Sequence, residues 1–490
     1  MTGLRRSVPD VRRTEVDGVP TIWAEAPGQL TAVLTFRVGR ADETPLEGGL
    51  SHIVEHLAFG PVGQPRFDCN AFVDGNRTSF HATGTDEEVA GFLSTVTTAI
   101  DELPVERLDR EIAVLKREGA RDDSILHAHR HVRYGMWGHG LVGEPEFGLG
   151  LLSPERIQAW ANAMFCTENA TLWLTGKPPA GLRLKLPSGV RRTAPAPVPI
   201  PGVELPVYVD GLPGIALGFE LSRELGAGSF MSILHRRLRQ RLRLDDGIVY
   251  DIVGDYEALD AHTAVALVGT DCEADDVQRV GTVAFDLLED LAAGNVEDQE
   301  LAGELDDLER ASADPTAIPG LLDAMAFDEL LGMPPRSPAD RLDEQARTRP
   351  EDVARHAGDA MRSLILLGSM AEPPASVRPY PLASAAPVDG REVKPLLSLF
   401  GVGRRQRLRI GAEGVTLLPM DGTITTIRYR DVVILEKPAD DEIVLWDRDG
   451  DRIYIPSIYW KGGARILAEI EAAIPRELVV EAKLSDDLID

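Results

Sequence analysis

Cysteine is scarce in this chain. Cys69, Cys166 and Cys272 are the only three among 490 residues, they are far apart, and none belongs to a Cys-x-x-Cys pair. A disulfide framework and a cysteine-ligated zinc site both need paired or clustered cysteines. We therefore expect neither.

Long apolar runs are also missing. No uninterrupted apolar stretch approaches the roughly 20 residues that a helix needs to span a bilayer. The first residues, MTGLRRSVPDVRRTEV, lack the apolar core of a signal peptide. The sequence thus predicts no membrane span and a cytoplasmic location.

Positive charge is in short supply. Lys and Arg number 51 against 79 Asp and Glu, for a net charge of −28. This balance disfavours nucleic acid and anionic membranes as partners. A cationic or neutral peptide would suit it, and solubility alone explains it as well. The hydrophobic content of 43% is enough for several packed cores.

Two proline-rich stretches, 186–202 and 371–390, read as extended connectors. They divide the chain into predicted domains at 1–185, 203–370 and 391–490. The first two segments each begin with a strand and an amphipathic helix, followed by further strands and helices. This shared order predicts an α+β protein with two homologous α/β-sandwich halves.

The third segment has a different pattern. Alternating strands are hinged at Asp421-Gly422 and at Asp449-Gly450, both good hairpin signals, and one helix follows them. The pattern favours a small β-barrel or curled sheet with a helical cap. It resembles a bacterial pleckstrin-homology-like domain.

The run GGLSHIVEHLAFG, residues 48–60, carries the clearest chemical signal. Residues four apart lie on one face of a helix, so His52 and His56 could hold one metal ion between them. Glu55 lies beside that face, near enough to touch a water on the metal. This HxxEH spacing occurs in zinc peptidases. A solvated helix face with a Glu–His pair is the alternative.

Catalytic zinc needs a third protein ligand. Glu111 and Glu118 in DREIAVLKRE are seven residues apart, so a helix would place both on one face. Either could complete a His, His, Glu site. Both could equally be surface carboxylates beside Arg110 and Lys116, and spacing alone leaves the two readings open.

Three runs together resemble the pitrilysin/insulinase family of inverzincin zinc peptidases. They are FRVGRADETPLEGGLSHIVEHLAFG, CNAFVDGNRTSF and DREIAVLKRE. The resemblance covers about residues 15–375 and leaves out the third segment. It implies zinc bound by His52, His56 and Glu118, with Glu55 as the general base. Glu111 would be a supporting carboxylate of the catalytic site.

The same resemblance suggests residues that bind substrate. Asn70, Ala71 and Phe72 would lie on a strand that pairs with the peptide. The stretch LRLDDGIVY is similar to the family's Arg-to-Tyr segment, so Arg243 and Tyr250 would contact the substrate backbone near the scissile bond. Asp246 departs from the family pattern, in which a basic residue is common there.

These features lead us to expect a zinc-dependent endopeptidase that cleaves peptides or unfolded segments inside a chamber, such as a precursor or leader peptide. A homodimer or a related partner chain would close the chamber. The alternative is a non-catalytic peptide-binding or scaffold subunit that keeps the peptidase fold. The presence of Glu55 favours the enzyme, because a scaffold has no use for a general base.

The segment HAHRH, residues 127–131, offers three alternate histidines. No strand signal surrounds them, so we expect a polar, solvated turn and not a second metal site.

Overall fold

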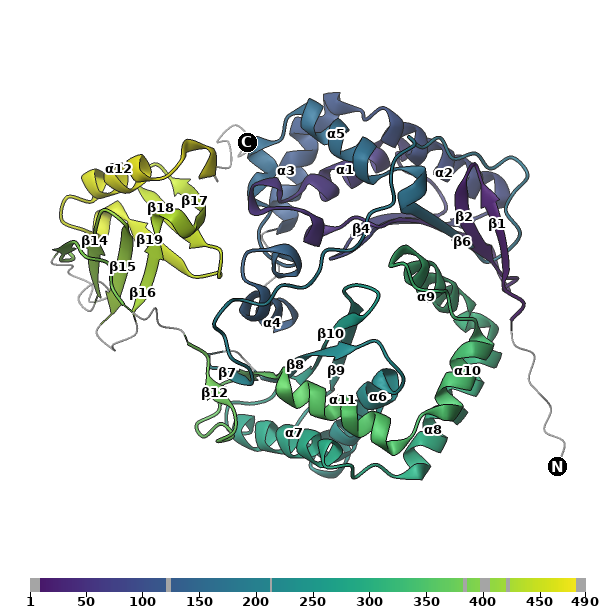
Figure 1. Ribbon diagram of the computed structural model, residues 1–490. Coiled ribbons are helices and arrows are strands. Elements are labelled where there is room, and N and C mark those ends of the chain that lie inside the picture. The colour runs from purple at the N-terminus through teal and green to yellow at the C-terminus, as the bar shows by residue number, and fades with distance from the viewer. Residues whose placement is uncertain are drawn as a thin grey trace.

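Buried apolar side chains form three large cores, within residues 19–184, 208–377 and 393–474. The computed structural model describes residues 9–119, 125–211, 214–381, 386–396, 406–419 and 424–481. Two α/β halves face each other, and the C-terminal part, yellow in Figure 1, lies at their side. The connector at 186–202 contains neither helix nor strand, whereas the one at 371–390 contains the short strand β12 (Arg378–Pro379).

The first half is built on a six-stranded sheet with the order β1-β2-β6-β3-β5-β4. Only β2 and β6 are parallel neighbours. Its strands are β1 (Arg12–Val16), β2 (Val19–Trp23), β3 (Leu30–Phe36), β4 (Asp68–Val73), β5 (Thr78–Gly84) and β6 (Ala170–Leu174). Its helices are α1 (Leu50–Phe59), α2 (Asp86–Asp101), α3 (Leu108–Glu118), α4 (Ile125–Tyr134) and α5 (Pro154–Met164).

Strand β3 shows why this sheet is buried on both faces. Successive side chains of a strand point to opposite faces. Leu34 and Phe36 therefore pack into the core beneath α1 and α2, while Val33 contacts a helix from the second half. This double burial explains the nearly unbroken apolar run at 30–36.

The second half repeats the plan of the first. Its sheet has the order β12-β7-β11-β8-β10-β9, and β7 and β11 are parallel as β2 and β6 are. The remaining strands are β7 (Val207–Val209), β8 (Ile215–Ser222), β9 (Val253–Ala258), β10 (Thr263–Thr270) and β11 (Ile365–Gly368). The helices are α6 (Ala227–Leu238), α7 (Val277–Ala292), α8 (Asp298–Ala313), α9 (Ile318–Leu330), α10 (Pro338–Arg347) and α11 (Pro350–Arg362). Two similar halves, as the order of elements predicts, are confirmed.

Helix α9 joins the halves. It belongs to the second half but packs on β2, β3 and β6 of the first sheet (Figure 1). Leu322 and Met325 are buried there against Ile22, Val33 and Trp173. Together with α8 and α10, it forms a wall that connects the two bodies on one side.

The C-terminal part is not the predicted barrel. It has two open four-stranded sheets, ordered β13-β14-β15-β16 and β19-β18-β17-β20, and no ladder joins them in the described residues. The chain passes from one sheet to the other through a 3-10 turn at Tyr429–Asp431, so the strands on either side of this corner do not pair. Both sheets and a helix share one core. The elements are β13 (Arg391–Val393), β14 (Gln406–Ile410), β15 (Gly414–Pro419), β16 (Thr425–Arg428), β17 (Val432–Ala439), β18 (Glu442–Asp447), β19 (Arg452–Pro456), β20 (Val479–Glu481) and α12 (Gly463–Ala473).

The hairpin predicted at Asp449-Gly450 is present between β18 and β19, with Gly450 at a φ of 91°. A positive φ suits glycine, which has no Cβ to clash. The hairpin predicted at Asp421-Gly422 lies outside the described residues. The tip of the β18–β19 hairpin contacts the first half, where the backbone N–H of Met136 donates to the carbonyl of Arg448 at 2.9 Å.

The turn predicted at 127–131 is wrong, because these residues lie within α4. His129 is buried, and His131 pairs through Nδ1 with Glu144 Oε1 at 2.7 Å. Arg130 and Arg133 on the same helix are also buried and contact the second half. The segment is therefore part of a helix between the halves, with His129 and Arg130 buried. No helix in the described residues is long and apolar enough to cross a membrane.

The packing of α9 gives a stability prediction. Leu322→Ala leaves a cavity between the halves, so we expect the free energy of unfolding to fall by about 2–4 kcal/mol. Chemical denaturation followed by circular dichroism measures it. The control is Leu244→Ala, at a side chain that is 56% exposed, where the change stays within about 0.5 kcal/mol. Equal losses in the two variants would contradict the packing of α9.

Candidate metal centre

Helix α1 carries the HxxEH residues, and its N-terminus is held by Glu43. The Glu43 carboxylate accepts hydrogen bonds from the backbone N–H groups of Gly49 at 3.0 Å and Ser51 at 2.7 Å. The first N–H groups of a helix lack partners within it, so this carboxylate satisfies two of them. Ile53 and Leu57 anchor the opposite face of α1 in the core. The polar face of the helix is thereby fixed in rotation.

His52 and His56 face a common point through their Nε2 atoms. Glu118 Oε2, from the last turn of α3, lies 3.7 Å from His52 Nε2 and 3.5 Å from His56 Nε2. Glu55 Oε2 lies 3.8 and 3.7 Å from the same two atoms. The sequence-predicted ligands and base, His52, Glu55, His56 and Glu118, therefore do meet in one place.

A carboxylate stands behind each imidazole. His52 Nδ1 is 3.0 Å from Glu146 Oε1, and His56 Nδ1 is 3.3 Å from Glu111 Oε2. Glu146 is held in turn by Arg40 Nη1 at 2.9 Å. A carboxylate that accepts a hydrogen bond from Nδ1 fixes the tautomer of the histidine and directs Nε2 toward the position of the metal. Glu111 thus supports a histidine, as the sequence suggests, and Glu146 is a partner that the sequence gave no sign of.

The charges around the site shift the protonation of its members. Burial lowers the pKa of His52, but the hydrogen bond and charge of Glu146 outweigh burial, so the net pKa lies above its ordinary value. Burial raises the pKa of the Glu55 carboxyl, and the opposing attraction of the histidines does not cancel it. A carboxylate with a raised pKa is a better proton acceptor near neutral pH.

The donor set fits zinc. Ligand atoms about 2.1 Å from a tetrahedral ion lie about 3.4 Å from each other. The two separations between Glu118 and the histidines, 3.7 and 3.5 Å, are close to that value. Side-chain donors from His52, Glu55 and His56 also lie within 4.8 Å of one another. Two imidazoles and a carboxylate are ligands that zinc uses in catalytic sites.

The site opens into a cavity of about 700 Å³. Asn70, Ala71 and Phe72 line it along β4, together with the metal-site residues. Strand β4 is the last strand of its sheet in the described residues, so one edge of its backbone is unpaired. An extended peptide can add to such an edge as a further strand. The predicted substrate strand therefore lies beside the predicted metal ligands.

Arg243 and Tyr250 lie elsewhere. All described residues that line the cavity belong to the first half. Tyr250 is 87% exposed, Arg243 stacks over its ring at 5.4 Å, and Arg243 Nη1 pairs with Asp251 at 3.1 Å. The structure thus does not bring them to the metal site, and their role in substrate contact stays a prediction.

The second half has the matching helix without the ligands. Helix α6 also begins after a glycine with positive φ, Gly226 at 93°, as α1 does after Gly49 at 99°. Counting from that glycine, Ser229 and Ile233 take the places of the two histidines. Helix α6 therefore lacks the pair of histidines that α1 presents.

Comparisons with known proteins bear on the fold. No family model and no curated protein matches the sequence. A protease from Helicobacter pylori matches at 15% identity and a TM-score of 0.58, over 74% of this chain and 100% of that one. Pitrilysin matches at 14% and 0.57, over 76% of this chain and 46% of its own. A structure described as an M16 peptidase inactive domain, from Pseudomonas fluorescens, matches at 13% and 0.57, over 74% and 100%.

The fold is that of the M16 peptidases. At these identities the likeness concerns the fold alone, and one of the similar structures is described as inactive. The chain spans less than half the length of pitrilysin. The chemistry must be argued from this chain's own residues.

Glu43 gives a prediction for pH. Burial raises its pKa to about 7 from 4.5, against the attraction of Arg40. The folded protein therefore keeps the proton over a range in which the unfolded chain has lost it, and stability falls as pH rises through that range. In Glu43→Gln this dependence disappears. We expect the variant to gain stability relative to the wild type between about pH 5 and pH 8, measured by urea unfolding with chelator present. A constant difference would contradict this.

Glu146 gives a prediction for metal binding. Glu146→Gln removes the charge behind His52, so zinc affinity should fall by about 10–100-fold. Competition with a chromophoric chelator measures it. Glu144→Gln is the matched control, because Glu144 lies two residues away and pairs with His131 instead. An equal loss in both variants would count against the orienting role.

Proposed function

We propose that this protein is a zinc-dependent endopeptidase that cleaves peptides or unfolded segments. One observation carries the proposal: four donor atoms, from His52, His56, Glu118 and Glu55, converge beside the open edge of β4. The residues proposed as metal ligands, as proton acceptor and as substrate-pairing strand are thereby adjacent. The M16 fold supports the same reaction class.

His52, His56 and Glu118 would hold the zinc. When bound, zinc supplies a Lewis acid that polarises the scissile carbonyl and lowers the pKa of water. Glu55 is buried and close to both histidines, so it is placed to take the proton from the attacking water. It then passes that proton to the leaving amine. Glu146 and Glu111 keep the two imidazoles in register throughout.

Asn70, Ala71 and Phe72 would hold the substrate in extended form. Main-chain hydrogen bonds between strands make few demands on side chains. This binding mode suits peptides and unfolded segments, because a folded protein seldom offers a free strand. Precursor or leader processing belongs to this class of reaction.

A second copy of the chain, or a related chain, would complete the chamber. The cavity is lined by the first half alone among the described residues, while Tyr250 is exposed on the second half. A neighbouring chain could present its Arg243 and Tyr250 to a substrate on β4. The oligomeric state in solution, by light scattering, tests this part of the proposal.

The second candidate function is a peptide-binding scaffold without catalysis. The inactive M16 domain among the similar structures favours it. In that case purified protein would bind unfolded chains, contain well under one zinc per chain and cut nothing.

Glu55→Gln tests the enzyme directly. The substitution keeps the size of the side chain but removes the proton acceptor, so kcat should fall by about 10²–10⁴-fold while zinc content is unchanged. Cleavage of a peptide mixture, mapped by mass spectrometry, measures it. Wild-type cleavage should also stop with chelator and return with zinc.

The matched control is Glu102→Gln, at an exposed position after α2. It should cleave like the wild type. Undiminished cleavage by Glu55→Gln would rule out the mechanism.

A further inference from the structure

The turn between β4 and β5 is anchored to the second half. Asn76, at the turn, is fully buried. Its Nδ2 donates to the carbonyl oxygens of Ala258 and Leu259, each at 3.0 Å, at the end of β9. The end of the substrate-pairing strand is thus fixed by a segment about 180 residues away in sequence.

Arg77, the next residue, connects the same strand to α9. Its Nε is 2.8 Å from Asp74 in the turn, and its Nη1 is 2.8 Å from Asp323 on α9. Its guanidinium also lies over two rings, 5.6 Å from the centroid of Phe72 and 4.8 Å from that of Phe327. Arg77 therefore lies between a substrate-strand side chain and α9. A planar guanidinium can stack and pair at once, which a lysine cannot.

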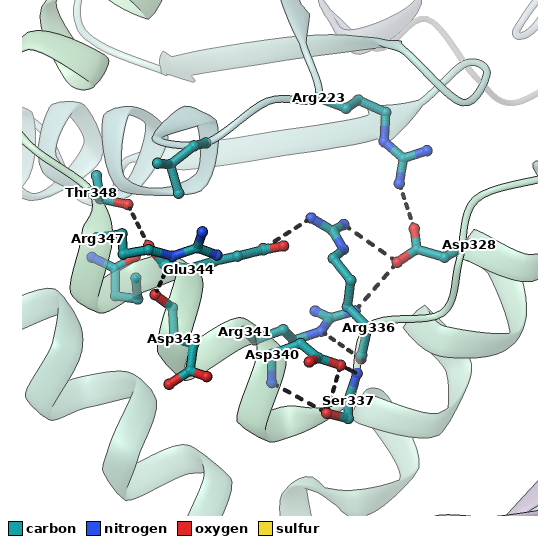
Figure 2. A network of polar contacts seen from close by, with 12 residues as sticks. Arg223, Asp328, Arg336, Ser337, Asp340, Arg341, Asp343, Glu344, Arg347 and Thr348 are labelled. Atoms are coloured by element: carbon teal, nitrogen blue, oxygen red, sulfur yellow. Dashed lines mark hydrogen bonds and ion pairs between the residues drawn. The ribbon is translucent and has the colours of Figure 1, made fainter.

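Helix α9 is a firm support for this contact. One face is buried on the first sheet, and Asp323 also accepts a hydrogen bond from Trp173 Nε1 at 3.2 Å. At its other end, Asp328 is buried among three arginines (Figure 2): Arg223 donates to it, and Arg336 and Arg341 lie 3.3 and 3.6 Å from it. A buried carboxylate paired in this way does not move freely. Arg77 therefore rests on a helix that both halves hold.

The contact between Arg77 and Phe72 matters because Phe72 lies on the strand proposed to bind substrate. It lines the metal cavity, and its side chain is 40% exposed although it stands at the pairing edge. On the side of Arg77 its ring is supported. Without that support the ring could turn across the edge, where it would obstruct an incoming strand.

We propose that Arg77 is a positioning residue for substrate: it holds Phe72 and the end of β4 in the conformation that admits a peptide strand, using α9 as its support. The inference rests on the proposed function, because it assigns β4 to substrate. It makes the second half a determinant of peptide binding. Removal of Arg77 weakens binding and leaves the chemistry at Glu55 intact, so KM rises while kcat does not change.

Binding is tested in the full-length Glu55→Gln protein, which holds substrate without cutting it. The probe is fluorescein-labelled lactalbumin, reduced and carboxymethylated so that it stays unfolded. We expect the Kd to rise about tenfold in Arg77→Gln and about threefold in Asp323→Asn, which breaks the support without touching β4. Arg77→Lys, which keeps the charge without the planar stack, should fall between Arg77→Gln and the parent protein.

Arg13→Gln is the matched control. Arg13 also pairs with α9, through Glu329 at 3.7 Å, but it belongs to β1, which lies at the opposite end of the sheet order from β4. Its Kd should equal that of the parent protein. An unchanged Kd in Arg77→Gln and Asp323→Asn would overturn the proposal, and so would an equal loss in Arg13→Gln, which would indicate general loosening between the halves.

Turnover separates this inference from the proposed function. With Glu55 restored, Arg77→Gln should show a raised KM and an unchanged kcat on the same probe. A fall in kcat with constant KM would overturn the positioning role. If the wild type showed no chelator-sensitive cleavage, the proposed function would fail, while the comparison of Kd values would still decide the role of Arg77. Thermal unfolding of each variant shows that it is folded.

Discussion

Two imidazoles one helical turn apart can bind the same metal ion only if a hydrogen bond to each Nδ1 fixes the orientation of the ring. Rotation of either ring about its own bonds would swing Nε2 away from the common point. In this protein Glu146 and Glu111 hold the rings, and Glu43 with the core beneath α1 holds the helix itself. The convergence of His52 and His56 on Glu118 depends on these supports more than on the motif.

The two similar halves contribute different features to the protein. Apart from the outer strands β1 and β12, the two sheets have matching strand orders, and each half has a helix that starts after a glycine with positive φ, yet only α1 carries the pair of histidines. The second half contributes in another way: its helix α9 packs on the first sheet, and partly buried charged pairs join the two halves. The first half carries the candidate metal site, and the second half supports the sheet of the first. Helix α6 has no histidine pair to present, so it can have the fully buried Ile233 at a position where a histidine would need a polar partner.

Much of the first half could be predicted from the sequence, because the signals are local. The spacing of His52 and His56 fixes their common face, and the spacing of Glu111 and Glu118 places both on one face of α3. Glu146 could not be found in this way, since it is 94 residues from His52 and lies in no recognisable motif. The prediction for HAHRH was wrong because Arg130 and His129 are buried at an inter-half contact, where a charged side chain does not indicate exposure to solvent. The barrel was likewise wrong, because alternation shows that strands exist but not whether their edges close.

The docking of the C-terminal part has a consequence for how the chain can be divided. Trp446 packs on Phe147 at 5.5 Å, next to Met136 and Leu141, and Phe147 directly follows Glu146. The segment that holds the His52 imidazole through Glu146 is thus packed against residues some 300 positions later in the chain. A fragment that ended after the second half would keep every residue of the HxxEH motif, but it would expose the apolar residues next to Glu146 that Trp446 now covers. The proline-rich stretch at 371–390 therefore separates two segments of sequence whose side chains pack together in the fold.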